Sequence, residues 1–219
     1  MPDAVIFDLD GVLVDSEERW NAAREALTRE SGGTWTAEAP RAMMGMSAPE
    51  WSRYLREELG VPMSDKDISD DVVARMEASY RRGLPLLPGA VETVHALSSR
   101  WPLGLASSAN KEIIGLVLDV AEIGRCFDAT VSSEEVTRGK PAPDVYLEAA
   151  RRLGVKARRC VAVEDSTNGL WSAHAAGMAV VAVPNRDYPP DPEALELAEA
   201  VVESVAEVTP ELVERAAAA

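Results

Sequence analysis

Two aspartates, Asp8 and Asp10, follow a short apolar run near the start of the chain, and Gly11 comes directly after them. The apolar run, residues 4–7, is typical of a buried strand, and in extended backbone side chains two positions apart share a side. Two acids on one side repel each other, which favours a bound cation or a shared proton between them. Gly11 allows a tight turn at this point. The pattern predicts a metal-assisted site with a carboxylate nucleophile.

Further polar residues stand just after later apolar runs or open a predicted helix. They are Ser107 and Ser108, Lys140, and Glu164 and Asp165. Ligands of open α/β sheets bind at the carboxyl ends of the strands, so we expect these side chains to converge with the two aspartates. A hard cation prefers carboxylate and carbonyl oxygens, a serine hydroxyl can donate to a phosphoryl oxygen, and a lysine carries a point charge. These residue types together favour phosphoryl transfer, which depends mostly on positioning and charge stabilisation.

The elements that must position these residues alternate between strand and helix along most of the chain. Continuous runs rich in β-branched residues predict strands at 4–7, 103–106, 161–163 and 179–183, with weaker candidates at 128–131 and 200–202. Helical periodicity predicts helices at 90–99, 112–121, 142–153 and 168–176. Such alternation indicates an α/β fold, with a parallel sheet covered on both faces.

Residues 15–84 break this alternation, because three amphipathic stretches follow one another without a convincing strand. Their apolar stripes are Trp20, Ala23 and Leu27; Trp51, Leu55 and Leu59; and Ile68, Val72, Met76 and Tyr80. Ser16 is a predicted N-cap of the first helix, and Pro49 suits the first turn of the second. The Gly and Pro residues of the return segment 81–89 are typical of an inter-domain connector. We therefore predict a core of residues 1–14 and 85–219 with a helical insertion at 15–84.

Composition limits the classes of partner. The formal net charge of −15 on 219 residues argues against binding a nucleic-acid backbone or an anionic membrane surface. No apolar run approaches the length of a membrane span and no secretory leader is evident, so we expect a cytoplasmic protein. Cys126 and Cys160 are too few for a disulfide framework and are expected to be reduced thiols. We expect a monomer or weak homodimer that acts on a small molecule.

Four motifs, taken in order, resemble those of the haloacid dehalogenase-like (HAD) superfamily. They are Asp8-Leu9-Asp10-Gly11-Val12-Leu13-Val14-Asp15-Ser16-Glu17, Ser107-Ser108, Gly139-Lys140-Pro141-Ala142-Pro143-Asp144 and Glu164-Asp165-Ser166. The chain is similar to the branch that carries a small helical cap after the first motif, which includes β-phosphoglucomutases and small sugar-phosphate phosphatases. The resemblance covers residues 3 to about 183. It implies a Rossmann-like, doubly wound core and a mobile, all-helical cap.

The resemblance also implies a role for each motif residue. Asp8 would be the nucleophile and a Mg²⁺ ligand, and Asp10 would be the general acid and base, lending the metal its backbone carbonyl. The other expected roles are phosphoryl binding by Ser107 and Lys140, with Ser108 beside them, and completion of the metal site by Asp165 together with Glu164.

Residues near the cap hinge could contact the substrate. Glu17 stands just after the first motif and could meet a substrate hydroxyl, although a first-turn acid that favours the helix dipole is an equal alternative. Met43, Met44 and Met46 cluster around Gly45 and are further candidates to face the substrate.

The function that these residues favour is a Mg²⁺-dependent phosphatase, which hydrolyses a small phosphorylated metabolite through an aspartyl phosphate on Asp8. Asp10 disfavours dehalogenases and phosphonoacetaldehyde-type enzymes, which lack an acid at its position. A β-phosphoglucomutase-type phosphomutase is the alternative, but Trp20 and Ala48 stand where similar mutases have His and Arg, which favours hydrolysis. A receiver-like phosphorylated signalling domain is a third and lower alternative, because receivers are shorter and carry no helical cap.

Overall fold

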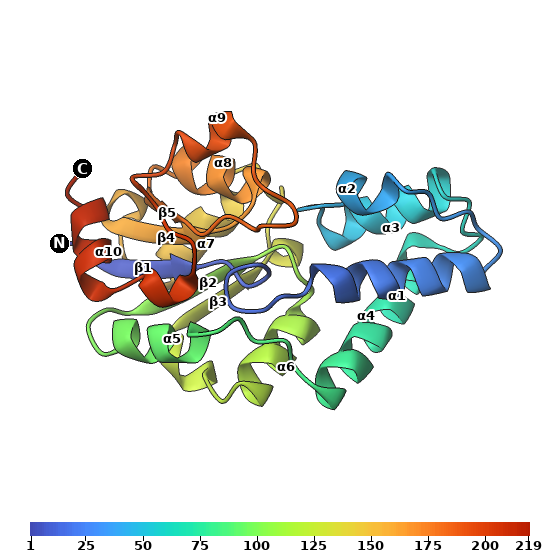
Figure 1. Ribbon diagram of the computed structural model, residues 1–219, viewed down its shortest axis with the longest axis horizontal. Helices are drawn as coiled ribbons and strands as arrows, with labels where there is room; N and C mark the ends of the chain where they lie inside the picture. Colours follow the sequence, from blue (N-terminus) through green and yellow to red (C-terminus); the bar gives the residue numbers. More distant parts are fainter.

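A six-stranded parallel sheet forms the centre of the larger part of the molecule in the computed structural model, which describes residues 1–219 (Figure 1). The strand order is β3-β2-β1-β4-β5-β6, and all neighbouring strands pair in parallel. The strands are β1 (Ala4–Phe7), β2 (Leu103–Ser107), β3 (Ala129–Ser132), β4 (Cys160–Glu164), β5 (Ala179–Ala182) and β6 (Ala200–Val201). Each overlaps a predicted strand, so the predicted α/β fold is confirmed.

Helices cover both faces of the sheet, which makes it doubly wound. One face carries α7 (Asp144–Arg152) and α8 (Thr167–Ala175), and the other carries α5 (Ala90–Ser98), α6 (Lys111–Val120) and α10 (Pro210–Ala216). The side chains of β1 alternate between two apolar clusters, with Ala4 and Ile6 in one and Val5 and Phe7 in the other. All four are fully buried, which explains the continuous apolar run that predicted this strand.

Two kinds of detail differ from the sequence-based expectation. The helix expected at 142–153 begins at Asp144, because Ala142 precedes Pro143 and the residue before a proline disfavours helical backbone. The short helices α2 (Ala39–Ala42) and α9 (Pro192–Leu195) have one turn each, which is too short for hydrophobic periodicity to reveal them.

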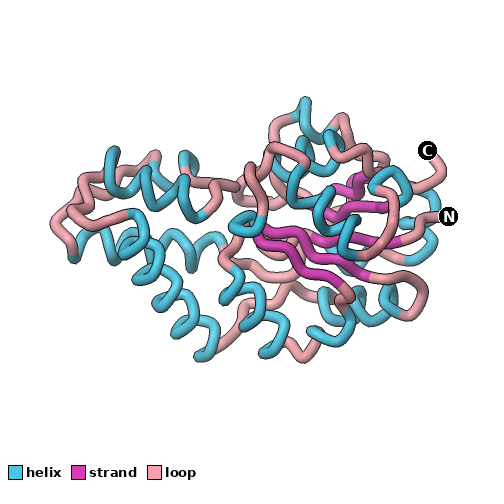
Figure 2. Tube along the Cα trace, turned by 180° about the vertical axis from the view of Figure 1, so that it is seen from behind, coloured by secondary structure: helices cyan, strands magenta, loops and turns pink.

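The helical segment lies beside the sheet, as both views of the backbone show (Figures 1 and 2). It consists of α1 (Glu17–Glu30), α2, α3 (Ala48–Glu57) and α4 (Asp65–Arg82), and the three predicted apolar stripes are buried in it. Pro49 lies in the first turn of α3, as predicted. Ser16 is the N-cap residue of α1, as predicted, but its side chain makes no capping hydrogen bond. The Ser16 hydroxyl donates to the Asp10 carboxylate instead.

The two connections between the sheet and the helical segment run side by side. Val14 and Leu86 form an isolated antiparallel bridge, the Asp15 amide donates to the Pro85 carbonyl at 2.8 Å, and the Leu87 amide donates to the carbonyl of Leu13 at 3.0 Å. A single apolar cluster extends from this side of the sheet into the helical segment. The segment is therefore joined to the sheet through one pair of adjacent connecting segments and a shared apolar contact.

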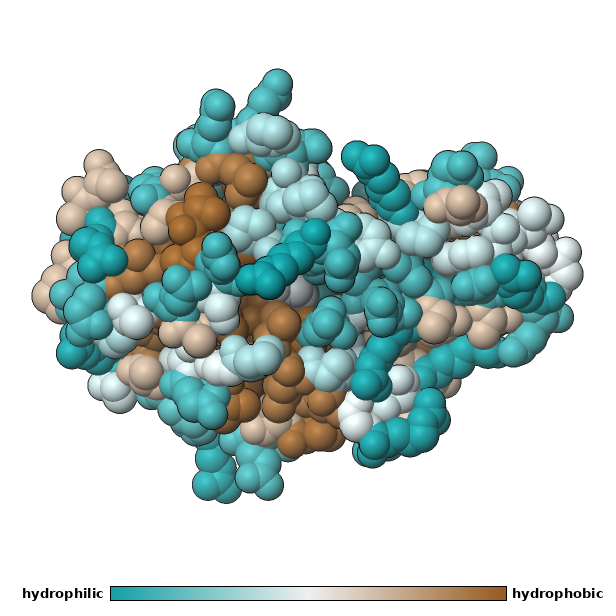
Figure 3. Space-filling model, viewed as in Figure 1, coloured by the Kyte–Doolittle hydropathy of each residue, from teal (hydrophilic) through white to brown (hydrophobic).

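The surface is not uniform in polarity. On the face seen in Figure 3, hydrophilic side chains cover most of the helical segment, and apolar side chains gather over the part that contains the sheet. No helix combines the length and the apolar character that crossing a membrane requires.

Candidate active site

One pocket lies where the carboxyl ends of the strands meet the helical segment. The sheet side supplies motif residues from loops after β1, β2 and β4, and the helical segment supplies large side chains. Its lining residues are Asp8, Asp10, Gly11, Ser16, Glu17, Trp20, Arg24, Met43, Met44, Gly45, Met46, Trp51, Ser108, Ala109, Lys140, Asp165, Ser166 and Asn185. The sequence motifs thus converge at one edge of the sheet, as the rule for open α/β sheets predicts.

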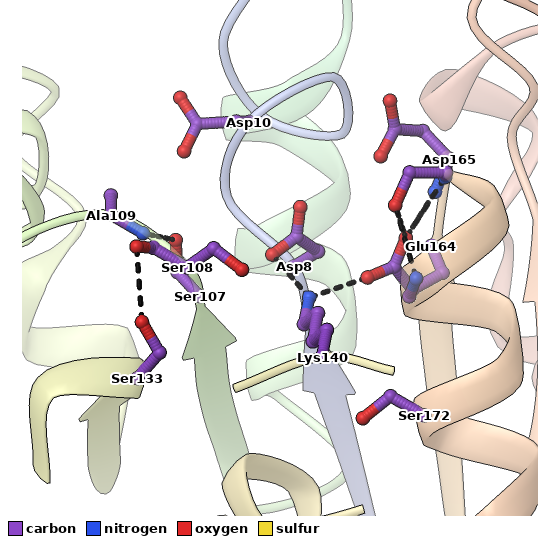
Figure 4. A network of polar contacts seen from close by, with 12 residues as sticks. Asp8, Asp10, Ser107, Ser108, Ala109, Ser133, Lys140, Glu164, Asp165 and Ser172 are labelled. Atoms are coloured by element: carbon purple, nitrogen blue, oxygen red, sulfur yellow. Dashed lines mark hydrogen bonds and ion pairs between the residues drawn. The ribbon is translucent and has the colours of Figure 1, made fainter. Parts of the chain in front are cut away.

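Lys140 joins two acids at the base of this pocket (Figure 4). Its Nζ donates to Asp8 Oδ1 at 2.7 Å and to Glu164 Oε1 at 2.5 Å. All three side chains are at most 8% exposed, so solvent screens these ion pairs little. Burial alone would lower the pKa of Lys140, but the charges of Asp8 and Glu164 outweigh it and raise that pKa above its ordinary value. Lys140 is therefore a fixed positive charge beside Asp8.

Three buried carboxylates, those of Asp8, Glu164 and Asp165, place one oxygen each within 4.8 Å of one another. Burial raises the pKa of Asp8 to about 7, against the opposing charge of Lys140. Burial, followed by the charges of Glu164 and Asp8, raises the pKa of Asp165 well above its ordinary value. A divalent cation would relieve this crowding, and an all-oxygen donor set suits Mg²⁺.

Glu164 and Asp165 are held differently, although they are adjacent. The second oxygen of Glu164 accepts from the amides of Asp165 and Ser166 at 2.8 and 3.0 Å, and the first accepts from Lys140 and from the Tyr146 hydroxyl. The Asp165 carboxylate accepts no hydrogen bond within the chain. Asp165 and Asp8 are thus the acids with free oxygens for a cation, and Glu164 is mainly an anchor for Lys140 and for the start of α8.

Gly11 makes room for Asp165. The backbone of Gly11 has a φ of 78°, a left-handed conformation that glycine adopts without strain, and a Cβ at this position would collide with the Asp165 carboxylate. The tight turn expected after the two aspartates is therefore also a packing requirement of the acid cluster.

Asp10 lines the same pocket but has a separate set of partners. Its Oδ1 accepts from the Ser16 hydroxyl at 2.5 Å and from the Trp20 indole Nε1–H at 3.2 Å. Because β1 ends at Phe7, a loop rather than strand alternation sets the direction of the Asp10 side chain. Burial raises the pKa of Asp10, and the hydrogen bonds from Ser16 and Trp20 oppose this shift. An acid with a raised pKa and fixed orientation is suited to proton transfer.

The two serines after β2 have different surroundings. Ser107 is fully buried, its hydroxyl accepts from the Ala109 amide at 3.0 Å, and it does not line the pocket. Ser108 does line the pocket, and its buried hydroxyl has no hydrogen-bond partner. Ser108 is therefore the serine whose hydroxyl is free to form a hydrogen bond in the pocket, whereas Ser107 fixes the turn that leads to it.

The helical segment contributes residues that sequence reasoning only partly found. Glu17 lines the pocket, as do all three methionines named above. Arg24 and Asn185 also line it and were missed. The signal for Arg24 lies in its spacing from Glu17, because residues seven apart lie on one face of a helix.

Comparisons with known proteins agree on one family. The model of the haloacid dehalogenase-like hydrolases matches residues 2–177. The chain is 34% identical over 212 residues to hexitol phosphatase B of Escherichia coli (strain K12), covering 94% of both chains. It is 35% identical over 187 residues to the probable pseudouridine-5'-phosphatase of Drosophila melanogaster, covering 82% of this chain and 80% of that protein.

The fold is similar to that of a solved relative over nearly the whole chain. The crystal structure of CbbY from Rhodobacter sphaeroides in complex with phosphate superposes with a TM-score of 0.87 and 27% identity, covering 98% of this chain and 100% of that one. The likeness therefore includes the helical segment as well as the sheet.

Proposed function

This chain belongs to the haloacid dehalogenase-like hydrolases, and we propose that it is a Mg²⁺-dependent phosphatase of a small phosphorylated metabolite, such as a sugar phosphate. The observation that carries this proposal is the buried group of Asp8, Lys140 and Asp165, which combines a nucleophile, a fixed cation and a cation ligand at one point. Relatives named as phosphatases of hexitols and of pseudouridine 5'-phosphate support the substrate class.

In the first step, an Asp8 oxygen attacks phosphorus and the bond from phosphorus to the leaving oxygen breaks. Lys140 holds the phosphoryl group by charge, and the Ser108 hydroxyl is placed to donate to it. Asp10 gives its proton to the leaving oxygen. In the second step, Asp10 takes a proton from water as its oxygen attacks phosphorus, the bond from phosphorus to the Asp8 oxygen breaks, and phosphate leaves the free Asp8 carboxylate behind. Mg²⁺, held by Asp8, Asp165 and the backbone carbonyl of Asp10, would offset the negative charge of the phosphoryl group.

Residues 15–84 form the proposed cap over this site. The pocket is partly open to solvent, and its inner volume of about 70 Å³ has room for only a few water molecules. A sugar phosphate needs more room than this, so the cap would move away to admit it, and the movement would turn at the paired connectors at Val14 and Leu86. Closure would then exclude bulk water from the first step.

We expect hydrolysis to require Mg²⁺. A panel of hexitol, sugar and nucleoside monophosphates should release phosphate with Mg²⁺ and none after chelation, and Mg²⁺ addition should restore the rate. In thermal melts without substrate, Mg²⁺ should raise the midpoint of the wild type, because it relieves repulsion among the buried acids. Asp165→Asn should lose that shift, and Asp119→Asn, an exposed acid on α6, should keep it. Full activity of the chelated protein would contradict the proposal.

Asp10→Asn should slow hydrolysis of alkyl phosphates by about 10²- to 10⁴-fold, because both proton transfers lose their acid or base. With p-nitrophenyl phosphate, whose leaving group needs no proton, the first step should stay fast and the second should limit turnover. Stopped-flow absorbance should therefore show a burst of nitrophenolate close to the enzyme concentration. Glu18→Gln, an exposed acid in the first turn of α1, is the matched control and should behave as wild type. Unchanged turnover of a sugar phosphate by Asp10→Asn would exclude this role.

The same assays separate the alternatives. A phosphomutase would isomerise β-glucose 1-phosphate in the presence of a bisphosphate activator without net release of phosphate. A receiver-like domain would hold a long-lived aspartyl phosphate and would not turn over p-nitrophenyl phosphate; the family match and the helical segment count against it.

A further inference from the structure

Arg24 is a buried cation in the pocket whose guanidinium makes no direct ion pair or hydrogen bond within the chain. Its side chain projects from α1 between two indoles, with the guanidinium carbon 5.1 Å from the Trp20 ring centroid and 5.2 Å from that of Trp51. The residue is 5% exposed, forms no ion pair, and its Nε–H has no hydrogen-bond partner. Stacking on two aromatic faces leaves the edge of the guanidinium, where its donors lie, free to bind.

A buried cation without a direct ion pair is unusual within this molecule, as a comparison with Lys140 shows. Lys140 and Arg24 are the two buried basic residues of the chain. Lys140 is paired directly with two carboxylates at 2.7 and 2.5 Å, whereas Glu17 and Asp10, whose charges act on Arg24, form no direct ion pair with it. A charge removed from water is costly unless it is paired and hydrogen-bonded. Stacking on indoles offsets part of that cost, but it uses none of the five N–H donors.

The position of Arg24 indicates which part of a substrate it would meet. The phosphoryl group belongs beside Asp8 and Lys140 at the edge of the sheet, and Arg24 lines the pocket from the helical segment. Glu17 lies two helical turns before Arg24, and its Oε1 is also buried without a partner. The leaving group would therefore meet an acceptor at Glu17 and a cluster of donors at Arg24.

We propose that Arg24 determines specificity by binding a second anionic group, a carboxylate or a phosphate, on the leaving group of the substrate. This inference rests on the proposed phosphatase function. A guanidinium binds planar or tetrahedral oxyanions through two parallel hydrogen bonds, and such charged pairs are about twice as strong as neutral ones. A hydroxyl on the chain between the two anionic groups would donate to Glu17.

The test compares substrates that differ only by the second anionic group. Glycerol 3-phosphate is matched with 3-phosphoglycerate, and fructose 1-phosphate with fructose 1,6-bisphosphate, so that the two pairs distinguish a carboxylate from a phosphate. We expect the wild type to have the higher kcat/KM on the member that carries the second anionic group, in at least one pair. Arg24→Met should lower that value by about tenfold to a hundredfold, mainly through KM, and should change kcat/KM little on the member without the second anionic group. Arg24→Lys should restore part of the preference.

The matched control is Arg19→Met. Arg19 lies on the same helix but donates to the Ser79 carbonyl and hydroxyl, and it does not line the pocket. Its substrate preference should equal that of the wild type. Two results would overturn the assignment of Arg24. One is a wild type that prefers the members without the second anionic group, and the other is an Arg24→Met variant that loses activity equally on both members of a pair. Wild-type protein that hydrolyses none of the four esters with Mg²⁺ would instead refute the proposed phosphatase function.

Discussion

Asp8→Asn should abolish steady-state phosphatase activity, with a fall in kcat of about 10⁴-fold or more, and should leave the protein folded. The amide nitrogen and carbonyl of asparagine are poor nucleophiles, so the covalent route through an aspartyl phosphate is lost. Phosphate release from a good substrate of the panel, followed over hours at high enzyme concentration, measures the residual rate. No phosphorylated protein should be detected by mass spectrometry after acid quenching, whereas the wild type should carry one phosphoryl group.

The fold should tolerate this change because Asp8 is not the sole partner of Lys140. Glu164 remains paired with the ammonium at 2.5 Å, and burial already disfavours the charged form of Asp8, as its raised pKa of about 7 shows. The thermal midpoint of Asp8→Asn should therefore lie within about 4 °C of the wild type, the shift expected from roughly 1 kcal/mol. Asp119→Asn provides the control for removal of an acid without loss of the nucleophile. Substantial activity in a homogeneous Asp8→Asn preparation would disprove the mechanism.

The sequence predicted the sheet and most of the site because both leave local signals. β1 and β4 are buried on both faces and so appear as continuous apolar runs, and a polar motif follows each run. Asp8, Lys140 and Asp165 were identifiable because their residue types have complementary roles and their motifs occur in order. Their contacts span up to 132 positions along the chain, yet the topology of an open α/β sheet brings strand ends together.

The features that the sequence did not reveal depend on how the helical segment packs against the sheet. Ser16 has the residue type and position of an N-cap, but its hydroxyl is used by Asp10. Trp20 was assigned to an apolar stripe of the first helix, whereas its indole N–H also donates to Asp10. Arg24 in an amphipathic helix is ordinarily a solvated charge, but here it is buried, with Trp51 of α3 packed against its guanidinium. None of these contacts follows from local propensity.

Trp20 also changes the argument between hydrolysis and phosphomutation. An indole N–H can donate to Asp10 but cannot accept a proton from it, so Trp20 orients the acid without sharing its proton. A histidine there could do both. In the proposed mechanism, Asp10 alone would then transfer the protons, first to the leaving group and later from the attacking water, which is all that hydrolysis requires.

Lys140→Met should be the most disruptive single change in the site for stability, and it should also lower activity. It leaves Asp8 and Glu164 buried without their shared cation, and breaking a buried pair by removing one partner costs about 3–5 kcal/mol. Activity should fall by about 10²-fold or more, because the transferring phosphoryl group also loses its fixed positive charge. Urea unfolding at pH 7 measures the first effect, and phosphate release in urea-free buffer the second. Lys66→Met, which removes an exposed ion pair with Asp70 on α4, should change neither measurably.

The pH dependence distinguishes this electrostatic effect from a packing defect. Burial already raises the pKa of Asp8 in the folded protein, and without the opposing charge of Lys140 that pKa should rise further. A carboxyl with a raised folded pKa favours folding at low pH, where both states bind its proton, and this contribution is lost as the pH rises through the folded value. The stability deficit of Lys140→Met relative to wild type should therefore be small near pH 5 and grow toward pH 8. A stability deficit that stays constant between about pH 5 and pH 8 would mean that Lys140 stabilises the protein through its packing. Its charge pairs with Asp8 and Glu164 would then not account for the stability of the site.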